Sequence, residues 1–122
     1  MSDVSPRLRV SADQSSAVLT LLFAGKMHDE DVRKVTAEVD RLTAVEVPIL
    51  MDLSLVTHMD SMGVALLVRV ARRQQEKSLP VAVIPGPGPV ARLLGVARLD
   101  RVLNVVFNRA EALQVLGIGN EG

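Results

Sequence analysis

Short apolar runs alternate with amphipathic stretches along this chain, and this alternation constrains its fold more than any other feature. The runs at residues 17–23 (AVLTLLF), 48–53 (PILMDL) and 79–84 (LPVAVI) have the length of strands. Continuous apolar strands are typical of a sheet that is buried on both faces. Residues 29–44 and 61–77 instead repeat apolar side chains at helical spacing. Strands that alternate with helices predict a mostly parallel sheet in an α/β domain.

Weaker signals extend this pattern toward both ends of the chain. Residues 8–10 predict an edge strand antiparallel to 17–23, and the polar residues 13–16 predict the turn between them. We expect Gly25 to end the second strand, and residues 54–59 to be a connecting segment. Further along, the pattern predicts a stiff Pro/Gly loop at 85–89, a short helix, a final strand at 102–107 and a last helix at 109–116.

The length of the chain sets the domain organisation. Its 122 residues are the size of one domain, and no internal repeat divides them. We therefore expect a single α/β domain over residues 1–122, with its core at about 8–116. The elements above predict a mixed sheet of about four to five strands with four helices.

Composition removes several classes of function. The 14 basic and 14 acidic residues balance, whereas nucleic acids and anionic membranes attract a basic excess. The absence of cysteine excludes disulfides and thiol chemistry, and His28 and His58 have no metal-ligand spacing. We expect no metal, no cofactor, no nucleic-acid partner and no insertion into a membrane. Since no secretory signal or apolar span is evident, the expected location is the cytoplasm.

The most informative stretch is the helix start Asp60-Ser61-Met62-Gly63, which follows a buried strand. Asp and Ser are common N-cap residues, so one interpretation of this stretch is a helix cap and nothing more. The alternative is a phosphoacceptor at Ser61, because unpaired backbone N–H groups and the helix dipole favour an anion there. Chemistry alone leaves both interpretations open.

A resemblance to a known family bears on this choice. The stretch DLSLVTHMDSMGVALL at residues 52–67 resembles the signature of the STAS domain family, the bacterial anti-sigma factor antagonists. The stretch VARLLGVARLDRVL at residues 90–103 is also similar to that family's segment at this point. The resemblance extends over roughly residues 8–116 in the order of the elements.

The resemblance implies a switch based on protein binding. Family members with an Asp-Ser-x-Gly motif often bind an anti-sigma factor that is also a serine kinase, which phosphorylates the Ser and so blocks binding. A phosphatase then resets the switch. Carried over to this chain, Ser61 is the phosphoacceptor, flanked by Asp60, Met62 and Gly63. Many members have a second hydroxyl residue where this chain has Met62.

Other residues are candidates for a supporting or binding role. We expect Asp52 to form hydrogen bonds that support the segment before Ser61. Loops often contact partners, so the expected loop before the first long helix supplies three candidates: Lys26, Met27 and His28. On the second long helix, the expected core stripe is Val64, Leu67, Val68 and Ala71. One side of that helix is then left as a candidate partner surface: Leu66, Arg69, Val70 and Arg73. The alternative for these four residues is that the apolar pair belongs to the core and that the two arginines face the solvent.

Two other classes of function are alternatives to this switch. The same fold without a switch would be an unphosphorylated scaffold, or the soluble STAS subunit of a membrane transporter such as a lipid-transport system. An enzyme is not expected, because nothing in the sequence assembles a nucleophile, a base and an oxyanion site. His58 precedes Ser61 by three residues, but no G-x-S-x-G elbow surrounds this serine.

Overall fold

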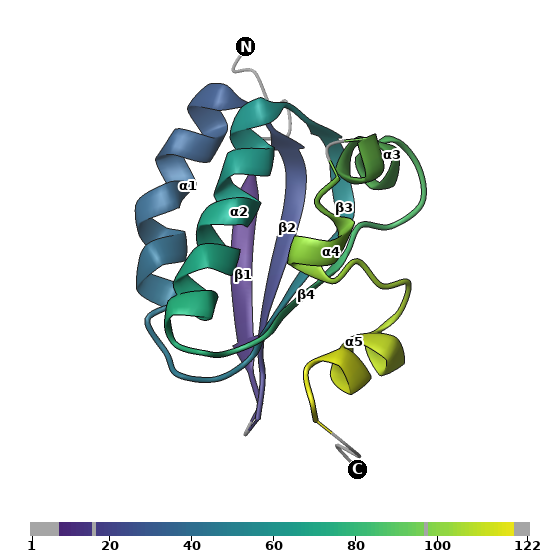
Figure 1. The fold of residues 1–122 in the computed structure, drawn as a ribbon. Coiled ribbons are helices and arrows are strands. Elements are labelled where there is room, and N and C mark those ends of the chain that lie inside the picture. Colours follow the sequence, from purple (N-terminus) through teal and green to yellow (C-terminus); the bar gives the residue numbers. More distant parts are fainter. Residues whose placement is uncertain (1–7, 16, 97, 119–122) are drawn as a thin grey trace.

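A four-stranded mixed sheet organises the chain (Figure 1), which a computed structural model describes over residues 8–15, 17–96 and 98–118. The strand order is β1-β2-β3-β4, with β1 antiparallel to β2 and the other neighbours parallel. The strands are β1 (Arg9–Gln14), β2 (Leu19–Met27), β3 (Ile49–Met59) and β4 (Val81–Ile84). This arrangement confirms the α/β class with a mixed sheet.

Helices cover the two faces of the sheet unequally. The helices are α1 (Asp29–Leu42), α2 (Ser61–Glu76), α3 (Pro89–Val96), α4 (Asp100–Leu103) and α5 (Arg109–Val115). Helices α1 and α2 run side by side over one face, and both begin at the carboxyl ends of the strands they follow (Figure 1). Helix α5 packs against β4 from the other face. None of the helices in the described ranges is long and apolar enough to span a bilayer.

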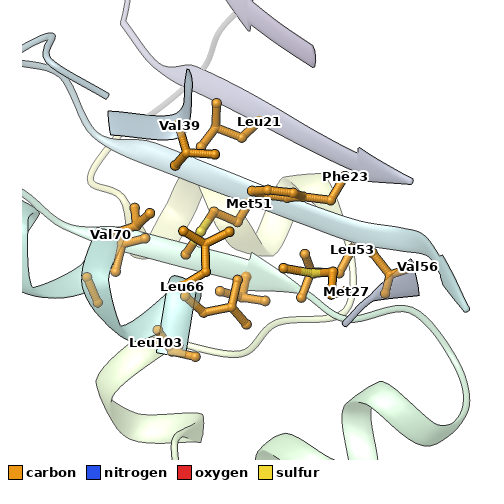
Figure 2. Packing of buried hydrophobic residues seen from close by; sticks show 14 of the residues in the cluster. Leu21, Phe23, Met27, Val39, Met51, Leu53, Val56, Leu66, Val70 and Leu103 are labelled. Atoms are coloured by element: carbon orange, nitrogen blue, oxygen red, sulfur yellow. The ribbon is translucent and has the colours of Figure 1, made fainter. Parts of the chain in front are cut away.

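The core lies mainly between the sheet and the pair α1 and α2. Alternate residues of β2 and β3 point into it, among them Phe23 and Met51, and α2 contributes Leu66 and Val70 (Figure 2). A smaller cluster on the opposite face includes Leu50 of β3 and residues of α5. Burial of each large apolar side chain favours folding by about 1.5–3 kcal/mol, so the larger cluster dominates stability.

Strands β1, β2 and β3 are longer than the sequence predicted. Strand β2 continues through Gly25, which has φ 107°, to Met27, and β3 includes residues 54–59. The predicted end at Gly25 and the predicted connecting segment at 54–59 are therefore wrong. Register shifts beside Gly25 let both extensions stay paired as far as Met27 and Met59. The predicted turn at 13–16 is also displaced, because Asp13 and Gln14 pair within β1; residue 16 lies outside the described residues.

The predicted strand at residues 102–107 is wrong. Val102 and Leu103 lie in helix α4, whose Leu103 is fully buried. Asn104 then adopts φ 53° and donates a side-chain hydrogen bond to Val81 O at 2.9 Å. Only Val105 pairs with the sheet, as an isolated parallel bridge to Val83. Because Leu103 is buried against the core as part of α4, this segment forms one bridge to the sheet instead of a fifth strand.

Candidate functional site

The predicted phosphoacceptor lies where β2 and β3 end and where α1 and α2 begin. Ser61 is the first residue of α2, and its side chain is exposed. The residue before it, Asp60, donates its backbone N–H to Met27 O at 3.1 Å. The turn that carries Ser61 is thereby attached to the end of β2.

One carboxylate organises this junction. Asp60 is the N-cap of α2, and its Oδ1 accepts hydrogen bonds from the backbone N–H groups of Met62 at 2.9 Å and Gly63 at 3.2 Å. Its Oδ2 accepts from the backbone N–H of Asp29, the first residue of α1, at 3.0 Å. Asp60 therefore satisfies N-terminal donors of two helices, and this arrangement leaves the Ser61 hydroxyl outside the cap.

The ionisation of Asp60 follows from these contacts. Burial penalises the charged carboxylate, but hydrogen bonds from the backbone of Asp29, Gly63 and Met62 favour it, as does the charge of His28. The favourable contacts prevail and hold the pKa of Asp60 below its ordinary value. A phosphoryl group on Ser61 would thus have an ionised carboxylate as its neighbour.

Gly63 sets how closely α2 approaches the sheet. A Cβ at this position would lie 2.7 Å from Met59 Cγ, 2.9 Å from Met27 Cβ and 2.9 Å from Met27 O. The first of these atoms belongs to a flexible side chain, but the carbonyl oxygen is backbone. Only a residue without a side chain fits this approach, so Gly63 fixes the position from which Ser61 projects.

Two imidazoles lie beside the same junction. His28 is the N-cap of α1, His58 is near the end of β3, and their ring centroids are 6.0 Å apart in an edge-to-face arrangement. His58 Nδ1 lies 3.1 Å from Thr57 Oγ1, which donates to Gly25 O at 3.3 Å. The sequence suggested His58 only as a base for Ser61 and did not predict its proximity to His28, because the pair forms only when β2 and β3 extend to these positions.

The structure corrects three of the candidate partner residues. Met27 is fully buried at the end of β2, and Leu66 and Val70 are 2% and 1% exposed. All three belong to the main core, so their assignment to a partner surface is wrong. Lys26 lies in β2 rather than in a loop and is half-buried, whereas His28 is exposed between β2 and α1.

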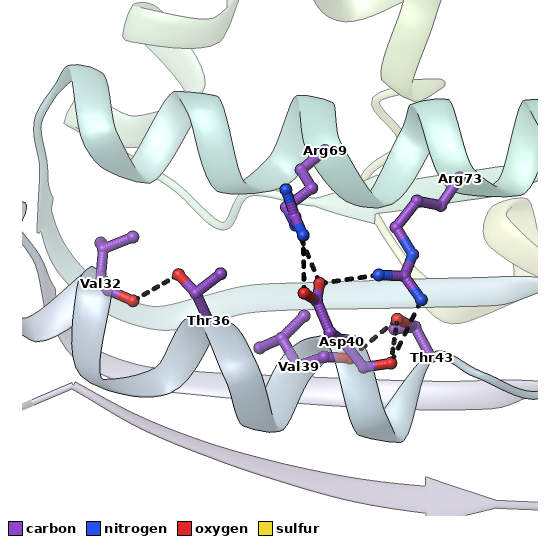
Figure 3. Close-up of polar contacts among 7 residues, drawn as sticks. All are labelled: Val32, Thr36, Val39, Asp40, Thr43, Arg69 and Arg73. Atoms are coloured by element: carbon purple, nitrogen blue, oxygen red, sulfur yellow. Dashed lines mark hydrogen bonds and ion pairs between the residues drawn. The ribbon is translucent and has the colours of Figure 1, made fainter.

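The two arginines of that candidate surface hold α1 and α2 together. Arg69 donates two hydrogen bonds to the Asp40 carboxylate, at 2.9 Å and 2.7 Å, and Arg73 Nη1 lies 3.0 Å from Asp40 Oδ1 (Figure 3). The hydrogen bond from Arg69 is the main cause of a lowered pKa at Asp40; burial opposes it, and the charges of Arg69 and Arg73 reinforce it. Both arginines are therefore engaged within the molecule.

The predicted core stripe of α2 is half correct: Leu67 and Ala71 are buried, but Val64 and Val68 lie on the outward face. Val64 and Val68 are only half-buried, because Leu66, Leu67 and Val70 face the sheet instead. A shallow groove of about 780 Å³ follows the outward face. Its lining begins at Ser61 and continues with Val64, Ala65, Val68, Arg69, Arg72, Arg73, Glu76 and Lys77.

Asp52 acts within β3, at some distance in sequence from Ser61. Its Oδ1 accepts hydrogen bonds from the backbone N–H of Ser54 at 2.9 Å and from Ser54 Oγ at 2.6 Å. Ser54 also lies against Gly86, where a Cβ would be 2.9 Å from Ser54 Cα. The last residue pair between β3 and β4 is Asp52 with Ile84. Asp52 thus orders the point where β3 separates from β4.

The chain is similar to known proteins in its family and in its fold. The family model described as "Mlab, STAS domain" matches residues 8–106. No curated protein sequence gives a significant match. Among solved structures, an anti-sigma factor antagonist from Mycobacterium paratuberculosis superposes with a TM-score of 0.82 at 16% identity, over 93% of this chain and 99% of that chain.

Two structures of SpoIIAA are also similar to this chain. The anti-sigma factor antagonist SpoIIAA in its unphosphorylated form gives a TM-score of 0.73 at 16% identity, over 92% of this chain and 100% of that chain. The Bacillus cell fate determinant SpoIIAA in its phosphorylated form gives 0.61 at 18% identity, over 87% of this chain and 97% of that chain. At these identities the likeness establishes the fold.

Proposed function

This chain belongs to the STAS domain family, and from that premise we propose that it is an anti-sigma factor antagonist switched by phosphorylation. In the proposal, the unphosphorylated protein binds an anti-sigma factor that has serine kinase activity. That kinase phosphorylates Ser61, which ends the binding, and a phosphatase restores it. In this proposal the protein itself acts by binding.

The observation that carries the proposal is the exposed position of Ser61 beside a complete helix cap. Asp60 already satisfies the backbone donors of Met62 and Gly63, so the hydroxyl is not needed for the helix. An exposed hydroxyl is accessible to a kinase, and its phosphorylation leaves the cap in place. The modification can therefore change the surface without unfolding the domain.

The electrostatics of the junction favour a large effect on binding. A phosphoryl group adds about −1.5 to −2 units of charge at neutral pH. The lowered pKa of Asp60 keeps a carboxylate ionised beside it. A partner that packs against the start of α2 would have to accommodate both groups, and an unmatched buried charge is costly. The two similar structures of SpoIIAA, one in each phosphorylation state, support the proposal that this fold accepts the modification.

Intact-mass spectrometry tests the modification directly. The full chain is incubated with ATP and the candidate anti-sigma kinase from its own host, alongside Ser61→Ala and a control variant, Ser11→Ala. Ser11 is an exposed serine of β1, on a different element from Ser61. We expect one added phosphate in the wild type and in Ser11→Ala, and none in Ser61→Ala. A phosphate that persists in Ser61→Ala would overturn the assignment of the site.

A second candidate function keeps the fold and omits the switch. The protein would then be an unphosphorylated STAS scaffold, or the soluble STAS subunit of a membrane lipid transporter. Met62 favours this candidate, because a half-buried apolar side chain packed on the core replaces the second hydroxyl residue found in many family members. Genes for transporter components beside the gene for this chain would support the second candidate, whereas a gene for an ATPase-type kinase would support the switch.

A further inference from the structure

Strand β1 forms one edge of the sheet (Figure 1), and no strand in the described part of the chain pairs with its outer side. Unpaired backbone groups at such an edge are a template for another strand, and proteins block them with a proline, a bulge or charged side chains. The register of β1 with β2 has no bulge, and its sequence RVSADQ has no proline. Its two charges, Arg9 and Asp13, have opposite signs, so a second copy of the same edge can match them.

The hydrogen bonds of the hairpin show which residues of β1 have free backbone groups. Ser15, which follows β1, donates its backbone N–H to Val18 O at 3.1 Å, and these two residues continue the register of β1 with β2. In an antiparallel pair, the residues that exchange hydrogen bonds alternate along each strand. The odd-numbered residues of β1 therefore direct their backbone N–H and C=O groups toward β2, and the even-numbered residues direct theirs outward. The outward-pointing residues are Val10, Ala12 and Gln14.

The side chains of β1 leave its outer side accessible. All of them are exposed except that of Val10, which is half-buried against the main core. A shallow groove of about 550 Å³ is lined by residues 8–11 and by side chains of neighbouring elements, among them Glu38 of α1 and Leu55 of β3. Leu55 is itself 56% exposed. Helix α1 therefore covers one face of β1 and leaves its edge open.

From these observations we propose that the free edge of β1 binds the same edge of a second copy of this chain, so that two sheets join into one across a two-fold axis. Pairing Val10 with Ala12 of the second copy uses the outward backbone groups of both strands. In that register Ser11 meets its own copy at the axis, and Arg9 lies directly opposite Asp13 of the second copy. The neighbouring register, with Ala12 opposite Ala12, places Arg9 opposite Ser15 instead. The charges therefore select one register.

Arg9 and Asp13 lie on the face of the sheet opposite α1 and α2. Leu8 and Val10 pack in the main core, and side chains alternate between the two faces along a strand, so the odd-numbered residues of β1 point to the other face. The two-fold axis gives two pairs of Arg9 with Asp13 there. Opposite charges directly across an antiparallel pair stabilise it, and like charges destabilise it. Because an exposed charge adds little to the folding of a single chain, reversal of a charge is a sharper test than its removal.

Sedimentation equilibrium of the full chain at increasing concentration tests this pairing. The compared proteins are the wild type, Arg9→Asp, Asp13→Arg, the double variant that carries both changes, and Arg92→Asp as control. Arg92 is an exposed arginine of α3, so its reversal changes the charge equally but away from β1. Far-UV circular dichroism verifies that each variant is folded.

We expect the average mass of the wild type and of Arg92→Asp to rise with concentration from one chain toward two. Each single variant places like charges opposite each other twice, so its dimer should be at least about tenfold weaker. The double variant exchanges the two charges and should dimerise like the wild type. An equimolar mixture of Arg9→Asp and Asp13→Arg should form a mixed dimer, because every Asp then faces an Arg.

Two results would overturn the inference. One is a wild type that stays monomeric up to millimolar concentration. The other is a mixture of the two single variants that is no more dimeric than either variant alone, since any other surface or register lacks this complementarity. Both results are independent of the proposed switch, which the inference goes beyond, because Ser61 lies in α2 and is unchanged in every variant.

Discussion

The two ends of α2 are held in place by different means. At its beginning, one carboxylate caps the helix, a glycine lets the backbone come close to the sheet, and Ser61 is left exposed. At its end, long polar side chains bind backbone carbonyls of other segments. Gln74 is buried and donates to Val47 O at 3.0 Å and to Pro80 O at 3.3 Å.

Lys77 continues this pattern at the same end. Its ammonium donates to Thr43 O at 2.8 Å and to Val45 O at 2.9 Å, which lie after the end of α1. One turn earlier, Arg73 binds Asp40 of α1. The end of α2 is therefore locked to the segments around it, whereas its beginning combines close backbone packing with an accessible hydroxyl. The comparison teaches that both ends of α2 are held in place, but that its beginning also leaves a hydroxyl accessible.

The largest effect is expected at the close approach, from Gly63→Ala. A methyl group there meets Met59 Cγ, Met27 Cβ and Met27 O at 2.7–2.9 Å, so we expect the free energy of unfolding to fall by about 2 kcal/mol. Urea denaturation measures the change. The matched control is Gly95→Ala in α3, where a Cβ would have nothing within 4 Å. Equal stability of both variants would show that the beginning of α2 is not packed as described.

The locked end of α2 is tested by Gln74→Ala. Two buried carbonyl groups, those of Val47 and Pro80, would lose their donor, so the free energy of unfolding should fall by roughly 1.5 kcal/mol. The neighbouring exposed residue provides the control, Gln75→Ala, for which the change should stay within about 0.5 kcal/mol. If Gln74→Ala were as stable as its control, the contrast between the two ends would fail.

The cap is expected to give a smaller, pH-dependent effect. Asp60→Asn should lower stability at pH 7 by about 1 kcal/mol, because the ionised carboxylate binds three backbone N–H groups. The pKa of Asp60 is lowered from 3.8, so its contribution is complete above that pH and is lost as the pH falls through the lower native value.

Unfolding curves at pH 7 and pH 3 check this sign. The difference in stability between the wild type and Asp60→Asn should narrow at the lower pH. An exposed acidic residue of β1 supplies the control, Asp13→Asn, whose difference from the wild type should be small at both values. A difference that widens toward pH 3 would contradict the assigned role of the carboxylate.

The smallest effect is expected at the partly exposed ion pairs between α1 and α2. Asp40→Asn should lower stability by about 0.5 kcal/mol, since the side chain is partly exposed and salt screens its charge. Denaturation in low and high salt should show the loss shrinking as salt rises. A loss as large as that of Gly63→Ala would mean that charge, rather than backbone packing, positions α2.

How much the sequence could predict depends on where the deciding contact lies. The start of α2 was predicted because Asp60 caps the helix through donors two and three residues away. The buried face of α2 was predicted only in part: Leu67 and Ala71 are buried as expected. Val64, Leu66, Val68 and Val70 are all apolar, and periodicity alone cannot choose among them. The sheet decides, by burying Leu66 and Val70.

The same reasoning explains the errors in the strands. Gly25 is a common strand breaker, and only the parallel pairing with β3 keeps β2 extended as far as Met27. The proximity of His28 and His58 depends on that extension, so no local pattern could reveal it. Arg69 and Arg73 were predicted as a surface, because their partner, Asp40, is 29 and 33 residues away in sequence.

The most direct test of the central claim measures binding in both states of Ser61. The candidate anti-sigma factor from the same host is titrated calorimetrically with the wild type, with phosphoserine at position 61, and with Ser61→Ala. The account predicts that phosphoserine weakens binding at least about tenfold, or about 1.4 kcal/mol, while Ser61→Ala binds like the wild type and all three unfold alike. Equal affinity of the phosphorylated and unphosphorylated proteins for a partner that binds them would contradict the account.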